Sequence, residues 1–361
     1  MRVALLFTLF VALLPDASWA WGPMTHLTHG ATVLAHVTIL GAGLQRLLRK
    51  HRWEFLYGCV GADITQAKKY TRSEQAHCHS WRVGWSLLAH AANDVQRAFA
   101  YGYLTHLAGD VFSHNHYVPV QLVLSYRSLA MGHVYWEARF DTLQSPEIRT
   151  LVRELRQREF PQCDELVRTV VSRTLFSFET DKRIFNSFIA VHDLDQWHRI
   201  IRRLAQRSQY TLPADLADQY NRACWAAILD MLEKGSNAAN QSADPTGLLA
   251  LRAASDIRRM LRALERNGPL PQDVARALTT LGERRELKEV AQLVSSAVGR
   301  LAPVRDPGSR AGADDGLRCP CYGAAANNAH VPGESIAERS RLHNRRTYTP
   351  VAGNPRVRTE G

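Results

Sequence analysis

Two pairs of residues, each a histidine followed four positions later by a carboxylate, constrain this chain more than any other feature. They are His106 with Asp110 and His133 with Glu137. Residues four apart in an α-helix lie on one face, one turn apart. An imidazole nitrogen and a carboxylate oxygen placed in this way can bind one metal ion, because zinc accepts both ligands. One such pair is common on a solvated helix surface, but two pairs within about thirty residues predict two helices that carry a metal site.

Apolar residues recur at helical spacing along most of the chain. The spacing is clear over residues 25–49, where a break is predicted near residues 41–43. Alternation with a period of two, which would indicate strands, is almost absent. We therefore predict an all-α, multi-helix fold. The other predicted helices of the main domain cover residues 81–91, 94–110, 122–143, 147–158, 164–175, 193–206 and 214–234.

The C-terminal part has a different character. Residues 235–247 are polar and predict a linker, and the helical segments that follow are rich in Arg but lack clustered His. From residue 302 onward Gly, Pro, Asn, Arg and Ser dominate, and the loss of periodicity is typical of disorder. We therefore predict a main domain over residues 21–235, a helical extension over 246–301 (helices 248–266, 272–281 and 287–301) and a disordered tail over 302–361.

Residues 1–20 have the pattern of a cleavable export signal. Arg2 supplies the positive charge, and the apolar run over residues 3–14 is too short to span a bilayer. Ser18-Trp19-Ala20 is close to the small-x-small cleavage pattern. We predict cleavage after Ala20, a mature chain that begins at Trp21, and a secreted or periplasmic protein. No later stretch is long and apolar enough to span a membrane.

The charge balance is weakly informative. The chain has 45 Lys and Arg against 34 Asp and Glu, and the excess is spread out rather than grouped. Such an excess favours contact with anionic surfaces such as phospholipid head groups or nucleic acid, and simple solubility explains it equally well. The six cysteines match no zinc-finger spacing, and export permits disulfides. Buried thiols explain them as well as any disulfide pairing does.

Further candidate ligands surround the two helix pairs. His26 lies five residues after the predicted new N-terminus, Asp63 follows an apolar helical run, and His79 stands at the head of a predicted helix. The candidates exceed the four ligands of one tetrahedral zinc, so they favour two or three ions with a bridging carboxylate. In chain order they are Trp21, His26, Asp63, His79, His106, Asp110, His116, His133 and Glu137.

This order resembles the zinc-dependent phospholipase C family and its relatives, the secreted zinc-dependent single-strand nucleases. The closest match is His106-x3-Asp110-x5-His116 followed by His133-x3-Glu137, and the resemblance covers residues 21–235. It implies an all-helical domain with three Zn²⁺ ions, one of them bound by the amine and carbonyl oxygen of an N-terminal Trp. The implied ligand sets are Trp21, His26 and Asp110 for one zinc; Asp63, His79, His106 and Asp110 for the second; and His116, His133 and Glu137 for the third.

The resemblance leaves some residues open. His77 competes with His79, which we prefer because the family's histidine is followed closely by an aromatic residue, here Trp81. His114 either orients a ligand or is merely exposed, and His29 is interpreted as a surface or core histidine. The five-residue step from the N-terminal Trp to the next ligand is nearer the nuclease branch, whereas the final Glu is nearer the phospholipase branch.

The resemblance implies hydrolysis of a phosphodiester. The first hypothesis is a monomeric phospholipase C that acts on glycerophospholipids at a membrane surface, with Asp63 orienting or deprotonating the attacking water. The second is a single-strand nuclease or 3′-nucleotidase, and a third is a non-catalytic metal-binding or lipid-binding protein. A nuclease needs aromatic side chains beside the metals to stack bases, although the same residue types also suit a lipid interface. The candidates for that stacking are Tyr101, Tyr103, Tyr117, Tyr135 and Trp136.

Overall fold

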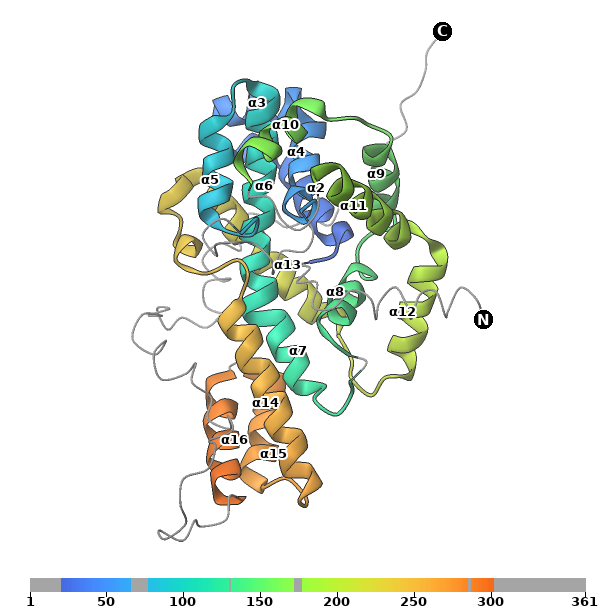
Figure 1. Cartoon of the computed structure of the whole chain (residues 1–361), viewed down its shortest axis with the longest axis vertical. Coiled ribbons are helices and arrows are strands. Elements are labelled where there is room, and N and C mark those ends of the chain that lie inside the picture. Colours follow the sequence, from blue (N-terminus) through green and yellow to red (C-terminus); the bar gives the residue numbers. More distant parts are fainter. Residues whose placement is uncertain (1–20, 66–76, 130, 172–176, 285–286, 302–361) are drawn as a thin grey trace. The chain divides into compact units, whose positions relative to one another are not determined.

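The computed structural model describes residues 21–65, 77–129, 131–171, 177–284 and 287–301 (Figure 1). Within these ranges every regular element is a helix or a short helical turn, and none is a strand. The prediction of an all-α fold is therefore confirmed. The predictions for residues 1–20 and 302–361, the signal peptide and the tail, lie outside the described residues.

The observed helices agree only in part with the predicted boundaries. The predicted break near residues 41–43 is present, because one helix ends at residue 35 and the next begins at residue 42. The helix predicted over residues 122–143 is in fact two helices, which leave residues 125–132 between them. One long helix, α11 (Phe178–Asp193), was not predicted. The elements up to residue 234 are α2 (Pro23–Ala35), η1 (Val37–Ile39), α3 (Ala42–Lys50), α4 (Arg52–Gly58), η2 (Gly61–Asp63), α5 (Trp81–His90), α6 (Asp94–Phe112), η5 (Ser113–Tyr117), α7 (Val118–Leu124), α8 (His133–Asp141), α9 (Glu147–Arg156), α10 (Pro161–Val170), α11 (Phe178–Asp193), α12 (Asp195–Arg207) and α13 (Ala214–Lys234).

Helix α6 is the centre of this arrangement. It packs against α2, α4, α5, α10 and α13 (Figure 1). Its residues from Ala98 to Val111 are almost all buried, as expected for a helix enclosed on every side. Its start is fixed by Asn93, whose side chain accepts a hydrogen bond of 3.0 Å from the backbone N–H of Gln96. The helix that carries the first His/carboxylate pair is thus held in place along its whole length.

Two glycines allow α4 and α6 to cross in direct backbone contact. A Cβ at Gly102 would lie 2.0 Å from the carbonyl oxygen of Phe55, and one at Gly58 would lie 2.0 Å from that of Phe99. Neither position can hold a larger residue without moving a backbone. This close crossing brings the carbonyl oxygen of Cys59, just after α4, to 2.9 Å from Nδ1 of His106 on α6.

Replacing Gly102 with alanine is expected to destabilise the protein by at least about 1–3 kcal/mol, the usual cost of overpacking a tight core. Gly43 in α3 is the matched control, since a Cβ there meets nothing within 4 Å. Gly43→Ala should be neutral or slightly stabilising. Chemical denaturation of both variants checks this, and equal stabilities would show that α4 and α6 can separate at no cost.

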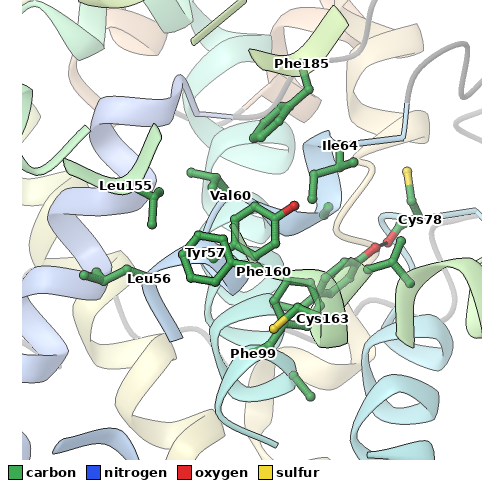
Figure 2. Packing of buried hydrophobic residues seen from close by; sticks show 14 of the residues in the cluster. Leu56, Tyr57, Val60, Ile64, Cys78, Phe99, Leu155, Phe160, Cys163 and Phe185 are labelled. Atoms are coloured by element: carbon green, nitrogen blue, oxygen red, sulfur yellow. Dashed lines mark hydrogen bonds between the residues drawn. The ribbon is translucent and has the colours of Figure 1, made fainter. Parts of the chain in front are cut away.

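An apolar cluster fills the space beside the α4–α6 crossing (Figure 2). Tyr57 stacks on Phe160 with ring centroids 4.3 Å apart, and its hydroxyl donates a 2.7 Å hydrogen bond to Asp164. Asp164 also accepts from Lys182 Nζ at 2.6 Å, so this buried carboxylate is paired. The cluster joins α4 and α6 to α9, α10 and α11 through residues including Leu56, Val60, Phe99, Leu155, Cys163 and Phe185.

The segment predicted as a linker, residues 235–247, is bound to the main domain. It forms two short turns, η6 (Gly235–Asn237) and η7 (Ala239–Ser242). The indole N–H of Trp81 donates to the Ala243 carbonyl oxygen at 2.9 Å, and that of Trp85 donates to Gln241 Oε1 at 2.7 Å. Beyond it, α14 packs against α7 and α16. The extension consists of α14 (Leu248–Arg266), α15 (Gln272–Arg284) and α16 (Leu287–Leu301).

Two further predictions can be compared with the described residues. No helix among them is both long enough and apolar enough to cross a membrane. Cys59, Cys78, Cys163 and Cys224 are buried free thiols, so the described part of the chain contains no disulfide between them. The two remaining cysteines, Cys319 and Cys321, lie outside the described residues.

Candidate metal centre

The Asp110 carboxylate lies at the centre of a buried group of histidines. Asp110 Oδ1 is 3.2 Å from His26 Nε2, and Oδ2 is 3.0 Å from His106 Nε2 and 3.3 Å from His79 Nε2. The three rings come from α2, α6 and the residue just before the N-cap of α5. That last position is fixed because Ser80 Oγ accepts a hydrogen bond from the backbone N–H at the start of α5.

Asp63, at the end of η2, completes this group. Its Oδ1 is 3.3 Å from His79 Nε2, and the Nε2 atoms of His79 and His106 are 3.2 Å apart. Ligands of a tetrahedral zinc, bound at about 2.0–2.1 Å, lie about 3.3 Å from one another. The ligand atoms of His79, His106 and Asp110 lie 3.0–3.3 Å from one another and therefore have the spacing of ligands around one zinc ion. Asp63 Oδ1 lies at the same distance from His79 Nε2, which makes it the candidate for the fourth ligand.

The hydrogen bond of His106 directs a lone pair into the group. Its Nδ1 faces the Cys59 carbonyl oxygen at 2.9 Å, and a carbonyl can only accept. The proton of the neutral ring is therefore assigned to Nδ1, which leaves Nε2 with its lone pair toward Asp110. This is the usual way in which a protein orients a metal-binding histidine.

The charges in the group also fit a cation. Burial acts to raise the pKa of Asp110, but the His106 and His26 imidazoles lower it well below its usual value. Burial, followed by His106, lowers the pKa of His26. Burial also acts to lower the pKa of His106, but Asp110 and Asp63 outweigh it and raise that pKa. Neither oxygen of the wholly buried Asp110 carboxylate completes a hydrogen bond, and such a charge is costly unless it is paired or binds metal. The residues present therefore fit zinc.

A second group consists of His114, His133 and Glu137. Glu137 Oε1 is 2.5 Å from His133 Nε2 and 3.7 Å from His114 Nε2. The potential ligand atoms of the three residues lie within 4.8 Å of one another. His114 Nδ1 is 2.6 Å from the Pro245 carbonyl oxygen, which assigns the proton to Nδ1 and the lone pair to Nε2. The ring centroids of His114 and His79 are 6.5 Å apart, so the two groups are neighbours.

The structure brings His114, rather than His116, to this second group, which differs from the predicted set of His116, His133 and Glu137. The His116 ring lies 5.5 Å from Phe112, and burial lowers its pKa. The chain enters a π-helical turn, η5, directly after α6. Gly247 packs closely on His114, since a Cβ at Gly247 would lie 2.3 Å from the His114 Cβ. The signal was present in the sequence, because His114 follows Asp110 by the same four residues that separate the members of each pair.

We expect His114→Ala to remove one bound zinc ion per chain, whereas His116→Ala should leave the zinc content unchanged. The reason is that, of these two histidines, His114 is the one whose ring nitrogen faces Glu137. Elemental analysis of the two purified variants, dialysed together with the unaltered protein, measures this. Loss of zinc from His116→Ala alone would restore the original prediction.

The structure keeps His79, and not His77, against the two carboxylates. His79 Nε2 is 3.3 Å from both Asp63 and Asp110, whereas His77 Nδ1 accepts a 3.1 Å hydrogen bond from the backbone N–H of His79. His77 therefore helps to set the backbone at His79.

Trp21 lies beside the first group. Its buried indole donates a 3.0 Å hydrogen bond from Nε1 to the carbonyl oxygen of Gly109, the residue before Asp110. The indole also stacks on Tyr117, with centroids 4.9 Å apart, and packs on Phe140 at 4.1 Å. The predicted first residue of the mature chain is thus fixed next to the carboxylate that it is expected to share.

His29 is a buried neighbour that the sequence pattern did not single out. Its ring centroid is 6.5 Å from that of His26, and a Cβ on Gly109 would lie 3.2 Å from its Nδ1. Burial, followed by His26, lowers its pKa to about 3, so the ring is neutral at ordinary pH. Of the two interpretations, surface or core, the structure supports the core. Its spacing of three residues from His26 on α2 was the available signal.

Comparison with known proteins agrees with this geometry. The family model described as zinc dependent phospholipase C matches residues 25–209, which is more than half of the 361-residue chain. The matched region contains eight of the nine predicted ligands, all except Trp21, and also His114. No curated protein and no solved structure matches the chain. On the strength of the family match and the buried His and carboxylate groups, the chain belongs to the zinc-dependent phospholipase C family.

Proposed function

We propose that the protein is a zinc-dependent phospholipase C that hydrolyses glycerophospholipids to diacylglycerol and a phosphorylated head group. The observation that carries this proposal is the 3.0–3.3 Å spacing of the ligand atoms of His79, His106 and Asp110, with Asp63 Oδ1 3.3 Å from His79 Nε2. The group lies in a chain of the zinc-dependent phospholipase C family, next to a second group that also suits zinc. We propose three ions in all, the third held between Trp21, His26 and Asp110.

Bound zinc would polarise the phosphoryl oxygens and lower the pKa of a water molecule toward ~7. Asp63 is the residue to which we assign the attacking water. It is buried, and its Oδ1 contacts His79 Nε2 at 3.3 Å, which fixes the carboxylate in one orientation. A carboxylate oxygen of Asp63 would orient the water and accept its proton as the water oxygen bonds to phosphorus and the bond from phosphorus to the glycerol oxygen breaks. The glycerol oxygen would take up a proton and leave as the hydroxyl of diacylglycerol.

The second group is the more exposed of the two and would face the incoming substrate. The His133 side chain is 19% exposed, whereas those of Glu137 and His114 are 3% and 1% exposed. The side chains of His26 and Asp110 in the first group are wholly buried. A phosphodiester would therefore approach from the His133 side, with the buried residues keeping bulk water from the reacting atoms.

The burial of the aromatic residues counts against the nuclease alternative. Base stacking needs exposed rings beside the metals. Tyr103, Tyr117 and Trp136 are wholly buried. Tyr117 and Trp136 also use their polar atoms inside the protein, with the Tyr117 hydroxyl donating to the Trp136 carbonyl oxygen at 2.8 Å. Three of the five aromatic residues that could stack bases are therefore part of the protein core, which weakens the nuclease alternative.

One assay separates the three hypotheses. Zinc-loaded protein that begins at Trp21 is offered phosphatidylcholine vesicles and single-stranded DNA side by side, and diacylglycerol and free nucleotides are measured. We expect diacylglycerol only. Nucleotides without diacylglycerol would support the nuclease, and neither product from zinc-loaded protein would support a non-catalytic role. Asp110→Asn, purified in the same way, controls for contaminating activity.

We also propose export of the protein, on the basis of residues 1–20.

A further inference from the structure

A second buried carboxylate, Asp141, holds the start of the helix that carries His26. Its Oδ1 accepts hydrogen bonds from the backbone N–H of Thr25 at 2.9 Å and from the Thr25 hydroxyl at 2.6 Å. Its Oδ2 accepts from the backbone N–H of Met24 at 3.2 Å. These are N–H groups of the first turn of α2, where most donors lack a partner within the helix. The Thr25 N–H also donates to the Gly22 carbonyl oxygen at 3.0 Å. Asp141 therefore acts as the N-terminal cap of α2, supplied from the far end of α8.

The neighbouring residues are shaped to receive this carboxylate. Gly22 is the N-cap residue of α2, and a Cβ there would lie 2.1 Å from Asp141 Oδ2. Thr25 is wholly buried, and its hydroxyl points at the same carboxylate. On the other side, His192 Nδ1 on α11 is 3.4 Å from Asp141 Oδ2. The carboxylate is thus enclosed between α2 and α11.

The position of Asp141 in the chain connects the two metal groups. His133, Glu137 and Asp141 follow one another at intervals of four residues on α8. His133 and Glu137 belong to the second group, and Asp141 fixes the residue that precedes His26 of the first group. One helix therefore sets the distance between the second group and the segment from Trp21 to His26.

We propose that Asp141 is a positioning residue for the zinc held on the Trp21 and His26 side of the centre. The proposal rests on the proposed zinc cluster, and Asp141 itself binds no metal in it. Without the cap, the first turn of α2 loses its three hydrogen bonds to α8. The His26 ring would then no longer be held at 3.2 Å from Asp110 Oδ1. The ligands outside the segment from Trp21 to His26 stand on η2, α5, α6 and α8 or next to them and would keep their places.

The test measures zinc retention in Asp141→Asn by elemental analysis after dialysis against zinc buffered by a chelator. We expect one ion per chain to be lost at a free zinc concentration about 10–100-fold higher than in the unaltered protein, the usual effect of losing a group that orients a ligand. The remaining ions should be retained as before. Asp164→Asn is the matched control, because it also alters a buried, hydrogen-bonded carboxylate but one that contacts Tyr57 and Lys182.

A double-mutant comparison separates positioning from a general loss of stability. In a His26→Ala background, Asp141→Asn should cause no further loss of zinc, whereas in a His114→Ala background the two losses should add. If Asp141→Asn fails to fold, Thr25→Val removes only the 2.6 Å bond and should weaken the same ion, and Thr25→Ser should restore it.

The outcomes are distinct. Equal zinc retention in Asp141→Asn and the unaltered protein, or the same loss in Asp164→Asn, would overturn the inference and leave the proposed function intact. An unaltered protein that binds no zinc would overturn the proposed function.

Discussion

Replacing Asp110 with asparagine is expected to lower lipid hydrolysis at least about a hundredfold, because even groups that merely orient a metal ligand cost 10–100-fold when lost. Asp110 contacts three imidazoles, one through Oδ1 and two through Oδ2. An amide offers a single weak acceptor in place of these two anionic oxygens. Both zinc ions that we propose to share the carboxylate would therefore be bound more weakly, and zinc content should fall together with the rate.

Glu137→Gln is the comparison for this variant. Glu137 belongs to the second group, where it faces His133 and His114, whereas Asp110 is proposed to bridge two ions. The loss of Glu137 should therefore affect one ion and reduce the rate less than Asp110→Asn. The measurement is the initial rate of diacylglycerol release by each folded variant, with circular dichroism to verify folding. Equal, mild losses in the two variants would show that Asp110 does not bridge two ions.

A protein with one extra glycine before Trp21 is expected to lose one zinc ion and nearly all activity. The resemblance implies that the free amine and the carbonyl oxygen of Trp21 bind that ion. An amide nitrogen shares its lone pair with the neighbouring carbonyl and is a very poor ligand. The Trp21 indole is already fixed by its bond to Gly109, so the extended chain has no simple way to offer another amine at the same place.

Trp21→Phe in the unextended protein is the control for this experiment. It keeps the free amine and loses only the 3.0 Å indole bond and part of the aromatic packing. It should retain more zinc than the extended protein. Zinc content and rate are measured for proteins that begin at Trp21, at Gly-Trp21 and at Phe in place of Trp21. An extended protein with full zinc and full rate would show that the terminal amine is not a ligand.

The sequence predicted the local part of this site well. Helical spacing is set by neighbouring residues, so it correctly placed His106 beside Asp110 and His133 beside Glu137. The ends of α13 and α14 also agree with the predicted ranges, residues 214–234 and 248–266. These features depend on the chain within one or two turns, which is the range over which periodicity carries information.

The long-range part could not be derived from periodicity. Asp63 follows the crossing of α4 and α6, which depends on two glycines that were not recognisable as a crossing point in the sequence. His79 contacts both Asp63 and Asp110 from a different segment of the chain. The choice of His116 failed to anticipate the π-helical turn and the Pro245 carbonyl oxygen that orients His114. The contact between His114 and Pro245 joins residues 131 positions apart, and only the folded chain brings them together.

His114 contacts the turn at residues 245–247, so a fragment of this chain must extend at least to residue 247 to hold the site. The family match ends at residue 209, and the predicted main domain ends at 235. A protein cut at either point would lack the Pro245 carbonyl oxygen and the close packing of Gly247 on His114. Deletion, domain exchange or fusion at the apparent boundary would therefore change a residue of the metal centre 95 or more positions upstream, so such cuts belong beyond Gly247.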